Sequence, residues 1–216
     1  RDEIVIGSPD ETRLIAEIQK RKDPEGMRLA RFLKLPDLSR TEGNPIHELA
    51  KRIVELPDFK DFDVLRVPEI VPAKEAFDLF NFPADHPVRS KSDTYYIGED
   101  HILRTHTTIM WYYWLKQPEV KNKIEKKESI GAVSYGKVYR KDEIDRHHMN
   151  VFHQMDGWYL TPKSVKIITI EDLKSVLIEI AQAIYGKDIH YRFNPDTFPY
   201  TEPSIDIEIE KEGRWV

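Results

Sequence analysis

The chain has 216 residues, 40% hydrophobic and 11% aromatic, which is enough apolar surface to bury the core of one domain. Its formal net charge of −5 excludes nucleic-acid binding through overall positive charge, so any RNA contact must come from local lysine and arginine patches. Zero cysteines exclude a disulfide framework, and no apolar run is long enough to cross a bilayer, so we expect a globular protein of the cytoplasm or of an organelle matrix, without a membrane partner.

Helix-start signals recur in the N-terminal quarter of the chain. Ser8-Pro9-Asp10-Glu11 supplies an N-cap, a proline at the first helical position and an acid three residues after the cap. Asp23-Pro24 ends this helix, and apolar residues at helical spacing, Met27, Ala30 and Leu33, predict a second short helix before Pro36. Asn44-Pro45 then predicts the cap and start of a third helix. Each signal is followed by apolar residues at helical spacing, so each predicted helix has one face to pack on a core.

A turn-rich linker separates these first helices from the rest. Residues 36–45 carry turn residues without periodicity, so we divide the chain into a short helical N-terminal segment with its linker, residues 1–40, and a main domain, residues 41–216. The main domain contains β-prone runs, which we place at 63–67, 94–97, 101–106, 132–141 and 151–160. These runs do not alternate regularly with helices, so the predicted fold class is α+β, an antiparallel β-sheet flanked by helices.

The clearest predicted helix follows Thr169. Asp172 completes a capping box with this threonine, and Gly186 provides the stop. The apolar face between them consists of Leu173, Val176, Leu177, Ile180, Ala181 and Ile184.

The polar residues that could carry chemistry concentrate in residues 136–157, GKVYRKDEIDRHHMNVFHQMDG. An alternating strand over 136–142 would place on one face Val138, Arg140 and Asp142. The return strand would place on one face Phe152, Gln154, Asp156 and Trp158. A face this polar is either a solvent-facing hairpin with cross-strand ion pairs or the site of a polar ligand, and the pattern leaves both readings open.

The loop between these strands permits a metal-site reading. It contains Asp145, Arg146, His147 and His148. Adjacent histidines point apart and cysteine is absent, so we assign no metal ligand in this chain.

Residues 136–157 resemble motif 2 of the class II aminoacyl-tRNA synthetases, and VYRKD and FHQMDG are similar to the phenylalanyl-tRNA synthetases in particular. Three further blocks resemble the same family: FPADHPVRSKSDTYYI at 82–97, ILRTHTT at 102–108 and FNPDTFPYTEPSIDIEIE at 193–210. Four blocks in the family's order are far more specific than any one of them. The resemblance implies the class II catalytic fold and the family's activity, which uses ATP and Mg²⁺ to convert phenylalanine to phenylalanyl-adenylate and then charges the 3′ end of tRNA(Phe).

The resemblance also implies an ATP-binding set, namely Arg140, Asp142, His148 and Phe152. Arg140 matches the motif 2 arginine that holds the α-phosphate and the substrate carboxylate, which suits its planar donor fork. His148 matches a loop position that contacts the outer phosphates, and Asp142 matches an acid on the ligand-facing strand. Phe152 matches the aromatic residue that stacks on adenine.

Amino-acid-binding positions carry over in the same way. Those matching the ammonium site are His106, Thr108, Gln154 and Asp156. His106 and Thr108 are two residues apart, which would place both on one strand face. Phe198 and Tyr200 match the aromatic pair that packs edge-to-face on the substrate ring. Pro68, in VPEI, is the candidate for the motif 1 proline.

Three positions depart from the family's usual residues. Asp142 and Asp156 stand where glutamate is usual, and Tyr200 stands where phenylalanine is usual. Each exchange shortens a side chain or adds a hydroxyl, so amino-acid selectivity is where we expect differences.

The sequence does not contain the glycine-rich motif 3, which carries a second ATP-binding arginine. We therefore expect residues 1–216 alone to be a poor catalyst. The resemblance covers both an α subunit that pairs with a β subunit in an (αβ)₂ assembly and a single-chain organellar-type enzyme. Two other functions stay open, a non-catalytic or regulatory paralogue that binds an amino acid and a class II ligase for another aromatic amino acid.

Overall fold

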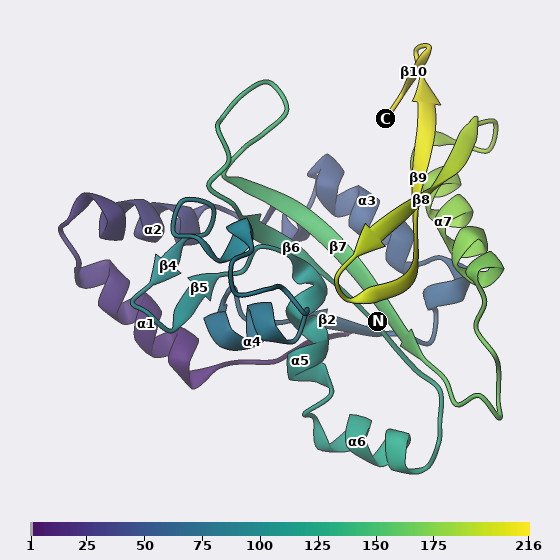
Figure 1. Cartoon of the computed structure of the whole chain (residues 1–216), viewed down its shortest axis with the longest axis horizontal. Coiled ribbons are helices and arrows are strands. Elements are labelled where there is room, and N and C mark those ends of the chain that lie inside the picture. The colour runs from purple at the N-terminus through teal and green to yellow at the C-terminus, as the bar shows by residue number, and fades with distance from the viewer. Residues whose placement is uncertain (1) are drawn as a thin grey trace.

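The centre of the molecule is a four-stranded mixed sheet, seen in a computed structural model that describes residues 2–216 (Figure 1). Its strands, in spatial order, are β1 (Glu3–Val5), β2 (Asp63–Arg66), β6 (Ile130–Tyr139) and β7 (Val151–Leu160). β1 and β6 both run parallel to β2, and β6 and β7 form an antiparallel pair of ten residues each. This long pair corresponds to the two strands predicted in the motif 2 region.

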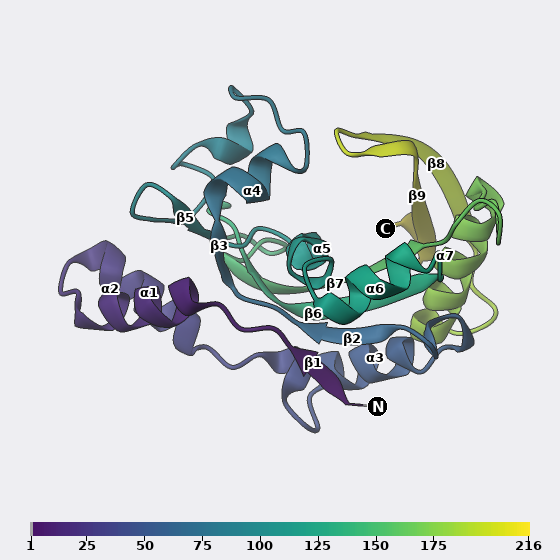
Figure 2. The same ribbon diagram turned by 90° about the horizontal axis from the view of Figure 1, so that it is seen from below.

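Two smaller sheets lie beside the central one, and both are antiparallel. The first contains β3 (Ile70–Pro72), β5 (His101–Leu103) and β4 (Tyr96–Ile97), and the second contains β10 (Arg214–Trp215), β9 (Thr201–Lys211) and β8 (Tyr191–Phe198). In Figure 2 the β8–β9 hairpin rises from the α7 end of the molecule and curves over the central sheet toward α4. The hairpin and α4 thus border the same face of the central sheet.

The α-helices flank both faces of the central sheet. They are α1 (Pro9–Lys20), α2 (Pro24–Lys34), α3 (Pro45–Val54), α4 (Ala73–Asp78), α5 (Met110–Trp114), α6 (Pro118–Glu125) and α7 (Ile170–Tyr185). Short 3-10 helices occupy Leu38–Arg40, Pro57–Phe59, Pro87–Arg89 and Thr107–Ile109. In Figure 2, α3 and α7 cover one face, and α4, α5 and α6 lie over the other.

Local capping explains where the predicted helices begin. Ser8, Asp23, Asn44 and Thr169 each accept a hydrogen bond from a backbone N–H in the first turn of their helix. Thr169 and Asp172 form the complete capping box, and Gly186 is the C-cap of α7. The helix starts predicted at Ser8, Asn44 and Thr169 are therefore confirmed, and Asp23, predicted only to end the first helix, also caps α2.

The N-terminal helices share a hydrophobic core with the rest of the chain. Leu14 and Leu29 pack in one cluster with Ile70, Leu103 and Tyr139. The buried ammonium of Lys137, on β6, donates to the carbonyls of Leu33 and Leu35 at 3.2 and 2.8 Å, which satisfies free carbonyls at the end of α2. The division at residue 40 stays a prediction, although packing joins its two sides closely.

The α+β class is confirmed, and two strands end earlier than predicted. β6 ends at Tyr139, so the strand expected over 136–142 stops three residues short of Asp142. β5 ends at Leu103, and residues 107–109 form a 3-10 helix, so the strand expected over 101–106 is wrong beyond its third residue. The run at 94–97 is a strand only at Tyr96–Ile97. Within residues 2–216, no helix has the length and apolarity that a bilayer span requires.

Candidate functional site

The pairing of β6 with β7 determines which side chains of β7 share a face. Directly opposite residues lie on the same side of an antiparallel pair, and here Val138 faces Phe152, Gly136 faces Gln154 and Ser134 faces Asp156. The polar face predicted for the return strand is therefore present. β6 itself is buried along its length except at Tyr135, which is half-buried, so the solvent-facing hairpin reading is wrong for this strand.

Arg140 lies just past the end of β6 and still points along this face. Its backbone N–H donates to the carbonyl of Asn150 at 3.0 Å, which extends the pairing by one step beyond the strand. The guanidinium carbon lies 5.1 Å from the centre of the Phe152 ring, and Nε donates to the carbonyl of Thr105 at 3.1 Å. Within residues 2–216, no carboxylate forms an ion pair with Arg140, so its terminal nitrogens remain free to bind an anion.

The loop after Arg140 carries two of the predicted ATP-binding residues away from the strand. Asp142 is exposed, and its backbone carbonyl accepts from the side chain of Asn150 at 2.9 Å. The expectation that Asp142 lies on the ligand-facing strand is wrong, because β6 ends before it. His148 is also exposed, and its Nδ1 lies 2.9 Å from the carboxylate of Asp145.

His106 is enclosed between the sheet and an aromatic cluster. Its ring meets that of Phe80 edge-on at 4.6 Å, and its Nδ1 is buried without a hydrogen-bond partner among the described residues. Burial, together with the nearby positive charges of Arg140 and Arg104, lowers the pKa of His106 to about 4. The imidazole is therefore neutral at pH 7 and can accept a hydrogen bond from a cation.

The residue that meets Asp156 is Thr107. Its hydroxyl donates to Asp156 Oδ2 at 2.6 Å. His106 and Thr108 do not share a strand face as predicted, because the chain turns into a 3-10 helix at Thr107. On the neighbouring position of β7, Gln154 has a buried Oε1 without a hydrogen-bond partner among the described residues. Two unsatisfied buried polar atoms in one region are characteristic of a ligand site, since such atoms are costly to leave unpaired.

An aromatic wall stands next to these polar groups. Tyr200, in the turn between β8 and β9, packs perpendicular to Phe80 with ring centres 5.1 Å apart. The ring of Phe198 lies 6.1 Å from the ring of Tyr200, with 37° between the two ring planes. Burial and the charge of Asp156 raise the pKa of Tyr200, while Arg140 acts in the opposite direction. The tyrosine hydroxyl therefore lies within electrostatic reach of both Asp156 and Arg140, and the turn of the hairpin faces the polar floor formed by β7.

A buried arginine, Arg104, packs against β6 next to this floor. Arg104 donates through Nε to the carbonyl of Lys137 at 2.8 Å and through Nη1 to the carbonyls of Val67 and Pro68 at 3.2 and 3.4 Å. It thus links the end of β2, the segment that leads to His106, and β6. Gly136 makes room for it, since a Cβ there would lie 2.6 Å from Arg104 Nη2. Pro68, the predicted motif 1 proline, enters this network through its carbonyl.

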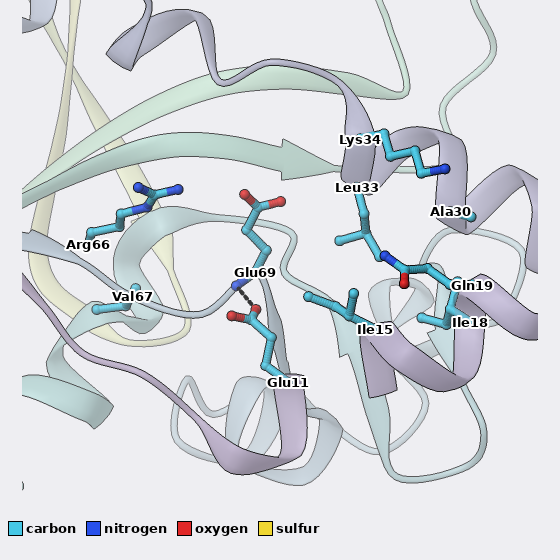
Figure 3. Close-up of a pocket in the computed structure, with 10 residues that line it drawn as sticks. All are labelled: Glu11, Ile15, Ile18, Gln19, Ala30, Leu33, Lys34, Arg66, Val67 and Glu69. Atoms are coloured by element: carbon cyan, nitrogen blue, oxygen red, sulfur yellow. Dashed lines mark hydrogen bonds between the residues drawn. The ribbon is translucent and has the colours of Figure 1, made fainter. Parts of the chain in front are cut away.

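The structure also contains a cavity that is separate from these residues. It has a volume of about 260 Å³ and lies between α1, α2 and the chain around Val67 and Glu69 (Figure 3). Glu11 in its wall accepts from the N–H groups of Glu69 and Ile70 at 2.6 and 2.9 Å, and the Tyr139 hydroxyl donates to the Glu69 carboxylate. Both carboxylates are engaged, so we do not treat this cavity as the chemical site.

No group of three or more histidine, cysteine, aspartate or glutamate side chains within residues 2–216 is arranged to hold a metal ion.

Comparison with known proteins identifies the family. A family model described as "tRNA synthetases class II core domain (F)" matches residues 32–216, most of the chain. The chain belongs to this class II synthetase family. Its resemblance to class II motif 2 and the α+β class II fold are thereby confirmed.

Three of the proteins similar to this chain carry the name "Phenylalanine--tRNA ligase alpha subunit". The one from Thermotoga neapolitana is 32% identical over 201 residues, which cover 92% of this chain and 57% of that protein. The one from Caldicellulosiruptor saccharolyticus is 36% identical over 156 residues, covering 72% of this chain and 38% of that protein. The one from a Sulfurihydrogenibium species is 34% identical, covering 72% and 37%. The chain therefore spans between about a third and three fifths of the length of these relatives.

Two residues of the site were missed by sequence reasoning. Thr107 was passed over because strict alternation through ILRTHTT selects His106 and Thr108, and the 3-10 helix breaks that alternation. Phe80 is fully buried and contacts His106 and Tyr200, yet in the sequence it is one of several phenylalanines near the end of α4. The sequence does carry a signal for the end of α4. Asn81 follows Phe80, and asparagine is one of the residues that adopts the left-handed conformation at a helix end.

Proposed function

We propose that this chain is the catalytic module of a phenylalanine–tRNA ligase, which activates phenylalanine with ATP and transfers it to the 3′ end of tRNA(Phe). The observation that carries the proposal is the junction of three features on one face of β7. These are the guanidinium of Arg140, which forms no ion pair with a carboxylate of residues 2–216, two buried polar atoms that lack a hydrogen-bond partner among the same residues, and an aromatic wall. An amino acid with an aromatic side chain presents the complementary carboxylate, ammonium and ring. The names of the relatives support the same choice.

In this proposal, polar residues of β7 and its neighbours bind the ammonium group. Asp156 supplies negative charge, and Thr107 fixes the orientation of its carboxylate through the 2.6 Å hydrogen bond. Neutral His106 and Gln154 each offer an acceptor atom that has no partner among the described residues. Thr108 remains a further candidate contact, half-buried at the same turn.

The phenyl group would lie against the wall formed by the β8–β9 turn. Phe198 and Tyr200 are candidates for edge-to-face contact with the substrate ring, because each keeps a partly exposed face, 43% and 37% respectively. Phe80 supports this wall from behind, since it is almost fully buried. The hydroxyl of Tyr200 distinguishes this wall from one made of phenylalanine alone.

Arg140 would bind the α-phosphate and the carboxylate that attacks it. In the activation step, a carboxylate oxygen forms a bond to the α-phosphorus of ATP while the bond to the bridging oxygen breaks, and pyrophosphate leaves. In the second step, a hydroxyl of the terminal adenosine of tRNA attacks the carbonyl carbon and AMP leaves. Arg140 stabilises the developing phosphoryl charge through its donor fork, held in place by Thr105 and Phe152.

The fit to ATP is partial in this chain. Phe152 offers a ring beneath the guanidinium of Arg140, which suits adenine stacking, and His148 lies in the loop between β6 and β7, the position that the resemblance assigns to the outer phosphates. Asp142 is less well placed, because it is exposed beyond the strand. Class II synthetases use Mg²⁺ with ATP, and we propose the ion for this chain on its family alone, since no group of three or more histidine, cysteine, aspartate or glutamate side chains within residues 2–216 is arranged to hold a metal.

For the partners, we propose phenylalanine, tRNA(Phe) and a β subunit in an (αβ)₂ assembly. The relatives' name, an alpha subunit, favours this assembly over a single-chain organellar-type enzyme. We place the protein in the cytoplasm or an organelle matrix, in keeping with its lack of cysteine.

The test is amino-acid-dependent exchange of pyrophosphate into ATP by the assembled enzyme that contains this chain. Phenylalanine should support exchange in preference to leucine, since edge-to-face contact adds about 0.5 to 1.5 kcal/mol beyond area burial, equivalent to about two- to twelvefold. Tyrosine and tryptophan belong in the panel, because a preference for either would indicate a ligase for another aromatic amino acid. Calorimetric binding of phenylalanine without exchange would instead indicate a non-catalytic relative.

A further inference from the structure

The β8–β9 hairpin reaches the amino-acid side of the site from a distance. It belongs to a sheet that shares no strand with the central one, and its base packs near α7, where the Lys174 ammonium lies 5.6 Å from the Phe193 ring. Its turn approaches the end of α4 (Figures 1 and 2), where the side chain of Asn81 reaches the carbonyl of Pro199. The position of Tyr200 therefore depends on contacts at the turn itself.

Three residues at the end of α4 make these contacts. The side-chain amide of Asn81 donates to the carbonyl of Pro199 at 3.2 Å. On either side of it, Phe80 and Phe82 meet the Tyr200 ring at 5.1 and 6.2 Å, both edge-to-face. The hydrogen bond joins residues 118 apart in the sequence, so it fixes the turn relative to the helix end rather than stabilising either element locally.

The backbone at Asn81 explains why its side chain can reach the turn. Its φ of 55° lies in the left-handed region, and the N–H of Phe82 bonds back to the carbonyl of Phe77 at 3.2 Å, as in a Schellman ending. Glycine and asparagine are the residues that tolerate this conformation best. Asparagine alone of the two also carries an amide, which here points out of the helix end to Pro199.

We propose that Asn81 is a positioning residue for the amino-acid pocket, whose amide holds the β8–β9 turn so that Tyr200 stays against Phe80. The inference rests on the proposed function, because it assigns Tyr200 to the wall that receives the substrate ring. Releasing the turn would loosen that wall without touching Arg140 or the ATP side. Asn81 should thus affect the Michaelis constant for the amino acid and leave that for ATP unchanged.

The experiment compares two variants that keep the left-handed backbone. Asn81→Gly removes the amide, and Asn81→Asp keeps the shape but places an acceptor opposite the Pro199 carbonyl. In pyrophosphate exchange by the assembled enzyme, KM for phenylalanine should rise about three- to tenfold in the glycine variant, as expected for one neutral hydrogen bond, and further in the aspartate variant. The kcat and the KM for ATP should stay within about twofold.

Lys127→Gly is the matched control, since Lys127 also has a left-handed backbone, with a φ of 58°, at the end of α6. It should leave all three constants unchanged. Parent-like KM values for phenylalanine in both Asn81 variants would overturn the proposal, as would equal changes in the constants for phenylalanine and ATP. If the parent enzyme itself shows no phenylalanine-dependent exchange, the proposed function fails; an active parent with unaffected variants contradicts Asn81 alone.

Discussion

Replacing Arg140 by alanine tests the central chemical role in the site. Among residues 2–216, the guanidinium donates through Nε to the Thr105 carbonyl at 3.1 Å and lies 5.1 Å from the centre of the Phe152 ring. Neither contact involves the terminal nitrogens, and the side chain is only half-buried. The fold should therefore survive the change, while the donors that face the substrate are lost.

The magnitude follows from these contacts. Removal of one donor to a charge that develops in the transition state raises the barrier by about 3 kcal/mol, equivalent to about 10² in kcat. Loss of the exposed cation–π contact costs about 0.5 to 1 kcal/mol of folding stability. Arg140→Lys should recover part of the activity through its charge, but not all of it, because lysine lacks the planar fork.

The assay is pyrophosphate exchange by the assembled enzyme, with circular dichroism to confirm the fold. Arg192→Ala provides a matched control, since the Arg192 guanidinium also lies over an aromatic ring, 4.3 Å from the centre of Trp215, but at the end of the β8–β9 hairpin opposite its turn, where it pairs with Glu208. The control should retain parental activity. Exchange at the parental rate by the alanine variant at 140 would show that Arg140 has been given the wrong role.

Further predictions concern the residues around it. Gly136→Ala should lower the free energy of unfolding by about 1 to 3 kcal/mol in chemical denaturation, because the new Cβ would lie 2.6 Å from the buried guanidinium of Arg104. Gly7→Ala is the control and should have little effect, since no atom lies within 4 Å of a Cβ built there. Folding stability should decrease by at most about 3 kcal/mol as the pH falls from about 6.5 to about 4. The reason is that His106 takes up its proton at a higher pH in the unfolded chain than in the folded one, and His106→Gln should flatten this profile. Thr107→Val should weaken phenylalanine binding in calorimetry about tenfold by freeing the Asp156 carboxylate, and Thr107→Ser should restore it; equal affinities for the valine and serine variants would contradict this.

The sequence determined the elements whose signals are local. The predicted helix starts at Ser8, Asn44 and Thr169 depend on a side chain that accepts from a backbone N–H two or three residues away, so the whole interaction lies within one short window. The β6–β7 pair could likewise be predicted, because its polar alternation is continuous over the return strand. The resemblance in the four blocks then identified the family and the residue types around the site.

Where local periodicity breaks, prediction from the sequence fails. Alternation carried Asp142 onto β6 and paired His106 with Thr108, but one strand ends at Tyr139 and the other gives way to a 3-10 helix. The turn leaves Thr107, fully buried, as the donor to Asp156. No local signal in the sequence of this segment indicates which of its threonines will donate to Asp156.

Tertiary structure alone decided the contacts between distant segments. Thr107 and Asp156 are 49 residues apart, and Asn81 and Pro199 are 118 apart. Such pairs form only when sheet register and hairpin curvature bring their backbones together, and neither quantity is encoded in the spacing of residues along one segment. The chemistry of the site could therefore be named from the sequence, whereas the side chains that orient it required the fold.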